Sequence, residues 1–230
     1  MLRVILMDFN GVILNDEPLH LELYRRILTE QGISLTKEEY YKKYLVLDDE
    51  DCFRQILEDQ GKPAPDLLIK QMARKKARLY QKEIPNRMAF FPGVTSFIPK
   101  AASRYGMGIV SGALREEIKK ILLHLHLLRY FAVIVSAQDV QKGKPDPEGL
   151  HKALEQLSLW LYKNTRGFVA IQPWECLVIE DSIDGIEMAH RAGMKCLAVA
   201  NTYPVEVLKT ADLVKTSLSG VTFKELEALF

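Results

Sequence analysis

The sequence has few cysteines, no excess of charge of either sign and no long hydrophobic run. Its 230 residues include three cysteines, Cys52, Cys176 and Cys196, which are too few and too far apart for a disulfide framework or a zinc site. Lysine and arginine total 31 against 30 acidic residues, so no net field favours nucleic acid or a membrane. The apolar run at 2–7 is too short for a signal peptide, and no segment reaches the ~20 apolar residues of a membrane helix. We therefore expect a soluble cytoplasmic protein that binds neither nucleic acid nor membranes.

The sequence does contain short apolar runs that alternate with helical patterns, interrupted once by a long helical block. Apart from Arg3, residues 2–7 are apolar and show no polar alternation, as expected of a strand buried on both faces of a parallel sheet. From about 16 to 88 the pattern is helical throughout. Helices are expected from Leu19 to the stop at Gly32, after a capping box at Thr36, at about 49–60 and at about 66–83.

After residue 88, apolar runs and helical patterns alternate again. Strands are expected at 106–110, 130–136, 176–179, 194–199 and 213–214, and helices after 91–94 and at 115–128, 147–160 and 183–192. Strands alternating with helices predict a parallel sheet with helices on both faces. The sequence therefore predicts an α/β fold with two domains, a parallel-sheet core formed by 1–15 plus 89–230 and an inserted helical domain formed by 16–88.

Several apolar runs are followed directly by residues that can do chemistry. In an open parallel sheet, ligands bind beyond the carboxyl ends of the strands, where the sequence places Asp8, Ser111 and Glu180-Asp181. Lys144 lies in the loop after the strand at 130–136. Carboxylates suit a hard divalent ion such as Mg2+, whereas the hydroxyl, the lysine and backbone N–H groups suit a phosphate. Asp8 would be the nucleophile, because metal and lysine neutralise the charge that repels a phosphate.

Four segments resemble, in order, the four motifs of the haloacid dehalogenase (HAD) superfamily. They are Asp8-Phe9-Asn10-Gly11-Val12, Ser111-Gly112, Gly143-Lys144-Pro145-Asp146-Pro147 and Glu180-Asp181-Ser182. The resemblance is greatest to the phosphoglycolate phosphatase and β-phosphoglucomutase-like branch, because residues 17–20 and 91–94 are similar to the two ends of its helical cap insertion. It spans almost the whole chain with the expected spacing.

The resemblance implies a Rossmann-like catalytic core, a helical cap and a phosphoaspartyl intermediate on Asp8. It also implies a Mg2+ cofactor held by Asp8, by the main-chain carbonyl of Asn10 and by Asp181. Glu180 would act on this site indirectly, by contacting the groups that bind the metal.

The same resemblance assigns the phosphate-binding and substrate-facing residues. Ser111, Lys144 and the Gly112 N–H would bind the phosphoryl oxygens. Glu17 and His20, beside the cap hinge, are candidates for contact with substrate. We therefore expect a small phosphorylated metabolite as the binding partner, and a chain that is a monomer or a weak homodimer.

Asn10 is the main departure from the family pattern. Phosphatases and mutases that share these motifs have an aspartate there, which protonates the leaving group and then activates water against the phosphoaspartate. Asn10 keeps the carbonyl but loses the proton relay, and such general acid–base catalysis contributes ~10²–10⁴-fold to rate. Asn15 stands where an acid is frequent, residues 44–51 lack the usual glycine of the substrate loop, and residues 159–174 form an unusually long stretch.

Three readings of Asn10 follow from the sequence. The first is a slow Mg2+-dependent phosphomonoester hydrolase, or a sugar-phosphate mutase in which the phosphoaspartate survives until a sugar phosphate returns. The second is a phosphometabolite-binding protein with little or no turnover, and the third is an engineered change that traps a phosphoenzyme. Dehalogenases of the superfamily use no metal, and their fourth motif does not resemble Glu180-Asp181. The presence of both acids therefore argues against a dehalogenase. Phosphonate-cleaving relatives need a lysine in the first cap helix, and residues 19–31 contain none. We expect the slow hydrolase.

A few other residues are expected to have structural roles. Arg74-Lys75-Lys76 and Arg78 should form the solvent-facing side of a helix. Asp184 should cap the helix that begins near it, with help in holding the metal ligands as the alternative. Trp160 and Trp174 should lie in packing or interface positions.

Overall fold

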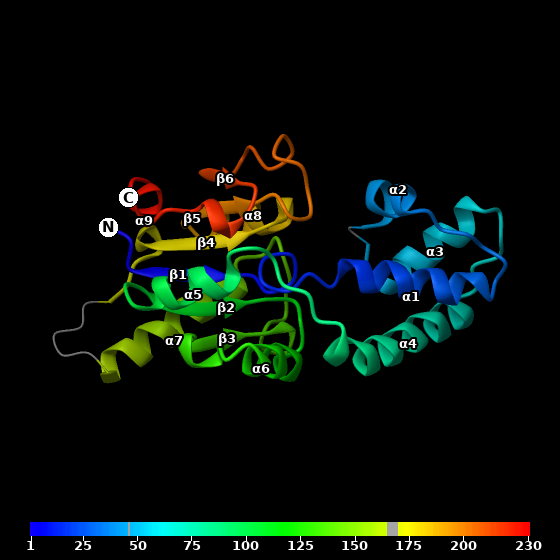
Figure 1. Ribbon diagram of the computed structural model, residues 1–230, viewed down its shortest axis with the longest axis horizontal. Coiled ribbons are helices and arrows are strands. Elements are labelled where there is room, and N and C mark those ends of the chain that lie inside the picture. Colours follow the sequence, from blue (N-terminus) through cyan, green and yellow to red (C-terminus); the bar gives the residue numbers. More distant parts are fainter. Residues whose placement is uncertain (46, 165–169) are drawn as a thin grey trace. The chain divides into compact units, whose positions relative to one another are not determined.

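The computed structural model describes residues 1–45, 47–164 and 170–230 (Figure 1). The chain forms two compact units. The core unit contains residues 1–15 and 89–230, and the helical unit contains residues 16–88. Within the described ranges, no helix is both long and apolar enough to cross a membrane.

A six-stranded parallel sheet runs through the core unit in the strand order β3-β2-β1-β4-β5-β6. The strands are β1 (Val4–Met7), β2 (Gly106–Val110), β3 (Val133–Val135), β4 (Cys176–Glu180), β5 (Lys195–Val199) and β6 (Leu213–Lys215). Every residue of β1 is buried, because strands flank it on both sides and helices cover both faces. This burial accounts for the absence of polar alternation in the first apolar run. The predicted α/β fold with a parallel sheet is confirmed.

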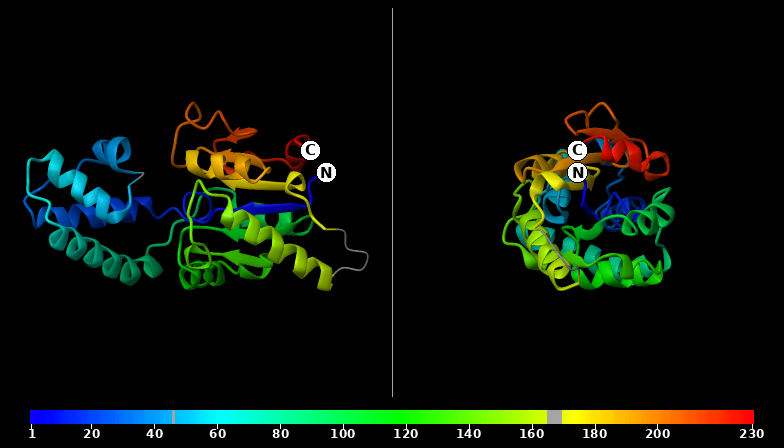
Figure 2. Two further views of the ribbon diagram at one scale, coloured as in Figure 1. Left: turned by 180° about the vertical axis from the view of Figure 1, so that it is seen from behind. Right: turned by 90° about the vertical axis from the view of Figure 1, so that its left-hand side faces the viewer.

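Helices cover the two faces of this sheet (Figures 1 and 2). They are α5 (Val94–Ala102), α6 (Arg115–His124), α7 (Glu148–Asn164), α8 (Ile183–Arg191) and α9 (Phe223–Glu227). Leu157 of α7 and Ile186 of α8 share one hydrophobic cluster with Leu6 of β1, while α5 lies on the opposite face. Gly108 of β2 allows α7 to approach, since a Cβ there would lie 2.9 Å from Leu6 and 3.2 Å from Leu157.

Two boundaries in the core unit differ from the sequence prediction. The third strand, expected at 130–136, contains only Val133–Val135, and a 3₁₀ turn at Leu128–Tyr130 lies between the helix and this strand. The final helix, α9, was not predicted. It is short, and its start is marked by a capping box in which Thr222 Oγ1 accepts from the Glu225 N–H at 3.3 Å.

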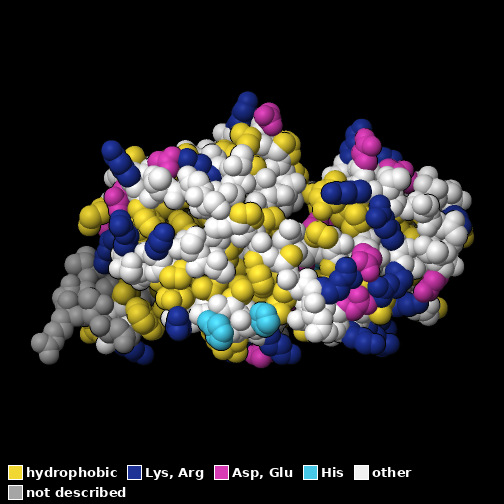
Figure 3. All heavy atoms as spheres, viewed as in Figure 1, with side chains coloured by type: hydrophobic (Ala, Val, Ile, Leu, Met, Phe, Trp, Pro, Cys, Tyr) yellow, Lys and Arg dark blue, Asp and Glu magenta, His cyan; other side chains and the backbone are white. Residues whose placement is uncertain are grey.

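The helical unit consists of helices and turns, and its described residues, 16–45 and 47–88, contain no strand. Its elements are α1 (Glu17–Thr29), α2 (Lys37–Glu39), a π-helical turn (Tyr40–Tyr44), α3 (Asp49–Asp59), α4 (Asp66–Glu83) and a 3₁₀ turn (Ile84–Asn86). The predicted capping box is present, with Thr36 Oγ1 accepting from the Glu39 N–H at 3.1 Å and a Glu39 carboxylate oxygen accepting from the Thr36 N–H at 3.0 Å. Basic and acidic side chains are interspersed on this unit (Figure 3).

Candidate active site

Three buried carboxylates lie together at the carboxyl ends of the neighbouring strands β1 and β4. The Asp8 N–H donates to the Ile179 carbonyl at 3.0 Å and extends the ladder by one residue, so Asp8 stands beside the residues that end β4. One oxygen from each of Asp8, Glu180 and Asp181 lies within 4.8 Å of the others, and no more than 6% of any of the three residues is exposed. Three buried acids at this separation require compensating positive charge.

Lys144 supplies part of that charge. Its Nζ lies 2.8 Å from Asp8 Oδ2 and also pairs with Glu180 Oε1. Burial opposes the charge on Lys144, but Asp8, Glu180 and Asp181 together raise the pKa of the lysine above its ordinary value. The lysine therefore stays charged, and one cation faces three acids.

The excess of negative charge is accompanied by raised pKa values of the acids themselves. Burial raises the pKa of Asp181 to about 8, and repulsion from Glu180 and Asp8 adds to the rise. Burial also raises the pKa of Glu180, against the opposing effect of Lys144. Asp8 Oδ1 is buried and has no hydrogen-bond partner within the described part of the chain. A buried, oxygen-only donor set with excess negative charge fits a hard divalent cation such as Mg2+.

Two glycines provide the space that these acids occupy. Gly11 has a left-handed φ of +76°, and a Cβ on it would lie 1.9 Å from Asp181 Oδ2. A Cβ on Gly185, in the first turn of α8, would lie 2.0 Å from the Glu180 carboxyl carbon. Side chains at either position would displace a carboxylate, and Gly11 also needs a backbone conformation that other residues rarely adopt.

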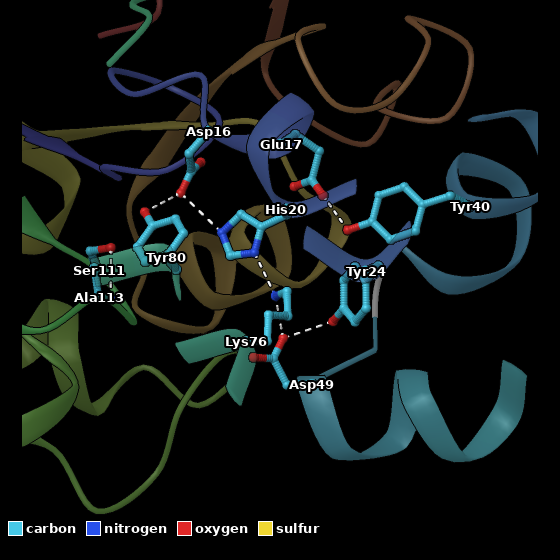
Figure 4. Close-up of polar contacts among 10 residues, drawn as sticks. All are labelled: Asp16, Glu17, His20, Tyr24, Tyr40, Asp49, Lys76, Tyr80, Ser111 and Ala113. Atoms are coloured by element: carbon cyan, nitrogen blue, oxygen red, sulfur yellow. Dashed lines mark hydrogen bonds and ion pairs between the residues drawn. The ribbon is translucent and has the colours of Figure 1, made fainter. Parts of the chain in front are cut away.

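Ser111 and Gly112 follow β2, the strand on the other side of β1. The Ser111 N–H donates to the Val135 carbonyl at 3.0 Å, and Ser111 Oγ accepts from the Ala113 N–H at 3.2 Å (Figure 4). A Cβ on Gly112 would meet nothing within 4 Å. The hydroxyl and this open backbone lie at the same edge of the sheet as Asp8, where an anion would meet O–H and N–H donors.

Asn10 lies in the turn that follows Asp8. The Ile13 and Leu14 N–H groups both donate to the Phe9 carbonyl, at 2.8 and 2.9 Å, and Asn10 itself is half-buried. The turn places the main chain of Asn10 two residues beyond the Asp8 carboxylate. Asn15 comes after the turn, and its N–H donates to the Ala89 carbonyl at 2.8 Å.

Sequence reasoning missed two residues that reach this site. Asn201 Nδ2 donates to the Gly11 carbonyl at 2.7 Å, and Thr202 Oγ1 donates to Asp181 Oδ2. They follow β5 directly, so the carboxyl-end rule that identified Asp8 would have found them too. Their polar segment, which precedes Pro204, instead resembles an ordinary turn.

His20 belongs to a polar network inside the helical unit, and Glu17 forms a separate pair with Tyr40 (Figure 4). His20 Nε2 lies 3.2 Å from Asp16 Oδ2, and His20 Nδ1 lies 2.7 Å from Lys76 Nζ. Glu17 accepts a hydrogen bond from the Tyr40 hydroxyl, and burial raises the pKa of Glu17. Both residues therefore have defined partners within their own unit.

The expectation that Lys76 lies on a solvent-facing side of its helix is wrong. Lys76 is only 1% exposed, with its Nζ 2.5 Å from Asp49 Oδ1 and 4.1 Å from the centroid of the Tyr24 ring. The buried residues of α4 are Ile69, Met72, Lys76 and Tyr80. Lys76 therefore continues the buried stripe at helical spacing, which the adjacent charges at 74, 75 and 78 conceal.

We expect Lys76→Met to lower the free energy of unfolding by about 1–3 kcal/mol, because methionine keeps the apolar stem but leaves the polar network without its cation. The matched control is Lys75→Met on the same helix. Lys75 is 47% exposed and pairs with Glu30, so its loss should change stability by less than about 0.5 kcal/mol. Urea unfolding followed by circular dichroism gives both values, and equal losses would contradict the structural role of Lys76.

The expectations for Asp184, for the two tryptophans and for the segments 44–51 and 159–174 can each be compared with the structure. Asp184 does not cap α8, because the N-cap is Ser182, whose side chain accepts from the Gly185 N–H at 3.1 Å. Trp160 and Trp174 are 45% and 65% exposed, respectively, so neither is a core residue. The stretch 159–174 includes residues 165–169, and the segment 44–51 includes residue 46, all of which lie outside the described residues.

Comparison with known proteins identifies related sequences and a related fold. Residues 5–199 match the family described as haloacid dehalogenase-like hydrolase. The chain is 32% identical over 206 residues to YhcW of Bacillus subtilis (strain 168), provisionally named a phosphatase, covering 87% of this chain and 84% of YhcW. It is 26% identical over 226 residues to the chloroplastic 5-amino-6-(5-phospho-D-ribitylamino)uracil phosphatase of Arabidopsis thaliana, covering 97% of this chain but only 57% of that protein.

Among solved structures, β-phosphoglucomutase (pgmB) from Clostridium difficile has a similar fold. The TM-score is 0.77 at 23% identity, and the match covers 100% of this chain and 97% of the mutase. At this identity the likeness concerns the fold alone.

Proposed function

Since the chain belongs to the haloacid dehalogenase-like hydrolase family, as its motifs predicted, we propose that it is a Mg2+-dependent phosphomonoester hydrolase with Asp8 as its nucleophile. The observation that carries the proposal is the ion pair between the buried Asp8 and the half-buried Lys144 within a cluster of three acids. A structural ion pair would not need two further carboxylates beside it. A site that receives a phosphoryl group and a divalent cation does need them.

We assign the cation to Asp8, Asp181 and the main-chain carbonyl of Asn10, with support from Glu180. When bound, Mg2+ would neutralise the carboxylates and the phosphoryl oxygens. An Asp8 carboxylate oxygen would form a bond to phosphorus as the bond to the ester oxygen breaks. Lys144 would attract the phosphoryl oxygens electrostatically.

Ser111 Oγ and the Gly112 N–H would donate hydrogen bonds to the same phosphoryl oxygens. The leaving oxygen must take a proton from water, because the Asn10 amide has none to give near neutral pH. Hydrolysis of the phosphoaspartate then needs a water molecule, again without a base at position 10. We therefore propose that both steps occur slowly.

We propose a small phosphorylated metabolite as the substrate, with sugar or sugar-alcohol phosphates as the first class to test. The support is the name of the Arabidopsis relative, whose substrate is a phosphorylated ribityl compound. A sugar-phosphate mutase is the second candidate. Asn10 favours it, because slow hydrolysis lets a phosphoaspartate persist until an acceptor arrives. Glu17 and His20 remain the proposed substrate-facing residues of the helical unit.

Acetyl phosphate, whose acetate leaving group needs little protonation, tests the proposed nucleophile directly. The protein is incubated with acetyl phosphate and Mg2+, and its intact mass is followed over time. We expect one phosphate adduct that maps to Asp8 and decays slowly. If the protein bound Mg2+ but formed no adduct, this result would instead support a phosphometabolite-binding protein. If it neither bound Mg2+ nor formed an adduct, the result would contradict the proposal.

The raised pKa of Asp181 predicts a pH-dependent response to Mg2+. An acid whose pKa is about 8 in the folded protein, against an ordinary 3.8, binds its proton more tightly there than in the unfolded chain. The stability this contributes is complete below pH 3.8 and is lost as pH rises through about 8. In EDTA, we therefore expect a lower melting temperature at pH 8 than at pH 6.

Excess Mg2+ should reduce this fall, because the cation replaces the proton as the partner of the carboxylate. Asp181→Asn should reduce it in EDTA as well, since the amide does not titrate. Equal melting temperatures at the two pH values in EDTA would show that the pKa of Asp181 does not lie where this prediction requires it.

A further inference from the structure

The segment after β5 touches two parts of the candidate metal site at once. Thr202 Oγ1 donates to Asp181 Oδ2, and Asn201 Nδ2 donates to the Gly11 carbonyl at 2.7 Å. Asp181 Oδ2 is also the atom nearest to where a Cβ of Gly11 would lie, at 1.9 Å. Gly11, Asp181, Thr202 and Asn201 therefore form a closed ring of contacts, which we call the 201–202 clamp.

The clamp spans strands that are not neighbours. In the sheet, β4 lies between β1 and β5, so Asn201 reaches across the end of β4 to a carbonyl 190 positions earlier in the sequence. Neighbouring strands lie about 4.8 Å apart, and here the side chain of Asn201 makes the connection between the segments that follow β1 and β5. The clamp thus connects the segments that follow three strands, and two of these strands, β1 and β4, precede the proposed metal ligands.

The backbone beneath the clamp is itself fixed. The Ala200 N–H donates to the Lys215 carbonyl at 2.8 Å and continues the pairing with β6, and the Asn201 N–H donates to the Val199 carbonyl at 2.8 Å. Asn201 and Thr202 are both partly buried. Their side chains therefore extend from an anchored turn, as is required of groups that hold other groups in place.

One contact of the clamp is with a proposed metal ligand, Asp181, and the other is with the residue next to a second one, Asn10. Donation to Asp181 Oδ2 fixes the rotation of that carboxylate. Donation to the Gly11 carbonyl restrains the Gly11–Val12 peptide, which is the next peptide after the one that contains the Asn10 carbonyl, a proposed ligand. Groups that orient metal ligands in this way commonly contribute about 10–100-fold to metal affinity.

We propose that Asn201 and Thr202 are positioning residues, which hold Asp181 and the backbone after Asn10 in the geometry that Mg2+ requires. The inference rests on the proposed function. It extends that function by assigning a role to a segment outside the four motifs.

The test is Mg2+ affinity, measured by isothermal titration calorimetry on the full chain. Thr202→Val keeps the shape of the side chain and removes the donor, so we expect the Kd for Mg2+ to rise about 10–100-fold. Thr202→Ser restores the hydroxyl and should recover most of the affinity. The matched control is Thr210→Val, at an exposed threonine later in the same connection, which should bind Mg2+ as the parent does.

Asn201→Leu should also weaken Mg2+ binding, and combining it with Thr202→Val should cost less than the product of the two single effects, because both act on one ring of contacts. Melting temperatures in EDTA separate this role from a merely structural one, since the Kd should change even where the metal-free protein melts as the parent does. If the parent binds Mg2+ and folded Thr202→Val binds it with a Kd within about twofold of the parent value, the positioning role of the clamp is wrong and the proposed function stands. If the parent binds no Mg2+, both are wrong.

Discussion

Asn10→Asp is expected to raise the rate of phosphoaspartate hydrolysis by about 10²–10⁴-fold, the contribution typical of a positioned general acid or base. The substitution changes one amide into a carboxyl of nearly the same shape. Asn10 lies in a turn held by two hydrogen bonds to the Phe9 carbonyl, so the variant should keep the backbone of that turn. The new carboxyl can donate a proton to the leaving oxygen and later accept one from water.

The gain should be separable into its two chemical steps. With acetyl phosphate, adduct formation should change little, because acetate leaves without protonation, whereas decay of the adduct should become much faster. With a sugar phosphate, whose alkoxide leaving group needs a proton, both steps should become faster. Intact mass over time and phosphate release measure the two steps.

Asn86→Asp provides the matched control, because Asn86 is exposed in the 3₁₀ turn of the helical unit. It adds the same negative charge without placing a proton donor in the turn after Asp8. Equal rates in Asn10→Asp and the parent would show that position 10 takes no part in proton transfer here. In that case, the slow second step would need another cause.

The residues that the sequence identified in the core share one local property. Asp8, Ser111 and Asp181 each stand directly after an apolar run, so strand direction alone brings them to one edge of the sheet. Their position could be inferred because strand and site are adjacent in the chain. Lys144 lies farther from its strand, and only its motif identified it.

The residues that the sequence concealed depend on contacts between distant segments. Lys76 looks like part of a solvated basic run, and only the packing of α4 against α1 and α3 shows that it belongs to the buried stripe. Asn201 and Thr202 have their partners on other strands. Local pattern describes the turn they occupy, but it carries no information on how far a side chain reaches across the sheet.

Replacing Asp8 with asparagine should eliminate the phosphate adduct. In the faster Asn10→Asp background, it should reduce turnover by about 10⁴–10⁶-fold, the range observed when a covalent catalyst loses a member of its attacking group. The amide keeps the size of the side chain, and Lys144 retains its partner Glu180. The variant should therefore fold, and in EDTA it should melt at or above the parent temperature, because one of three mutually repelling acids is gone.

That pair of effects distinguishes a reactive group from a structural one. A structural carboxylate would lose stability on replacement, whereas a site that concentrates charge for catalysis gains stability when the charge is removed. Asp184→Asn is the matched control, since Asp184 is an exposed acid in the first turn of α8 and should leave labelling and melting unchanged. If the Asp8→Asn variant still formed a phosphate adduct, another residue would be the nucleophile. A large fall in melting temperature without Mg2+ would show that Asp8 is held in place for stability rather than for reaction.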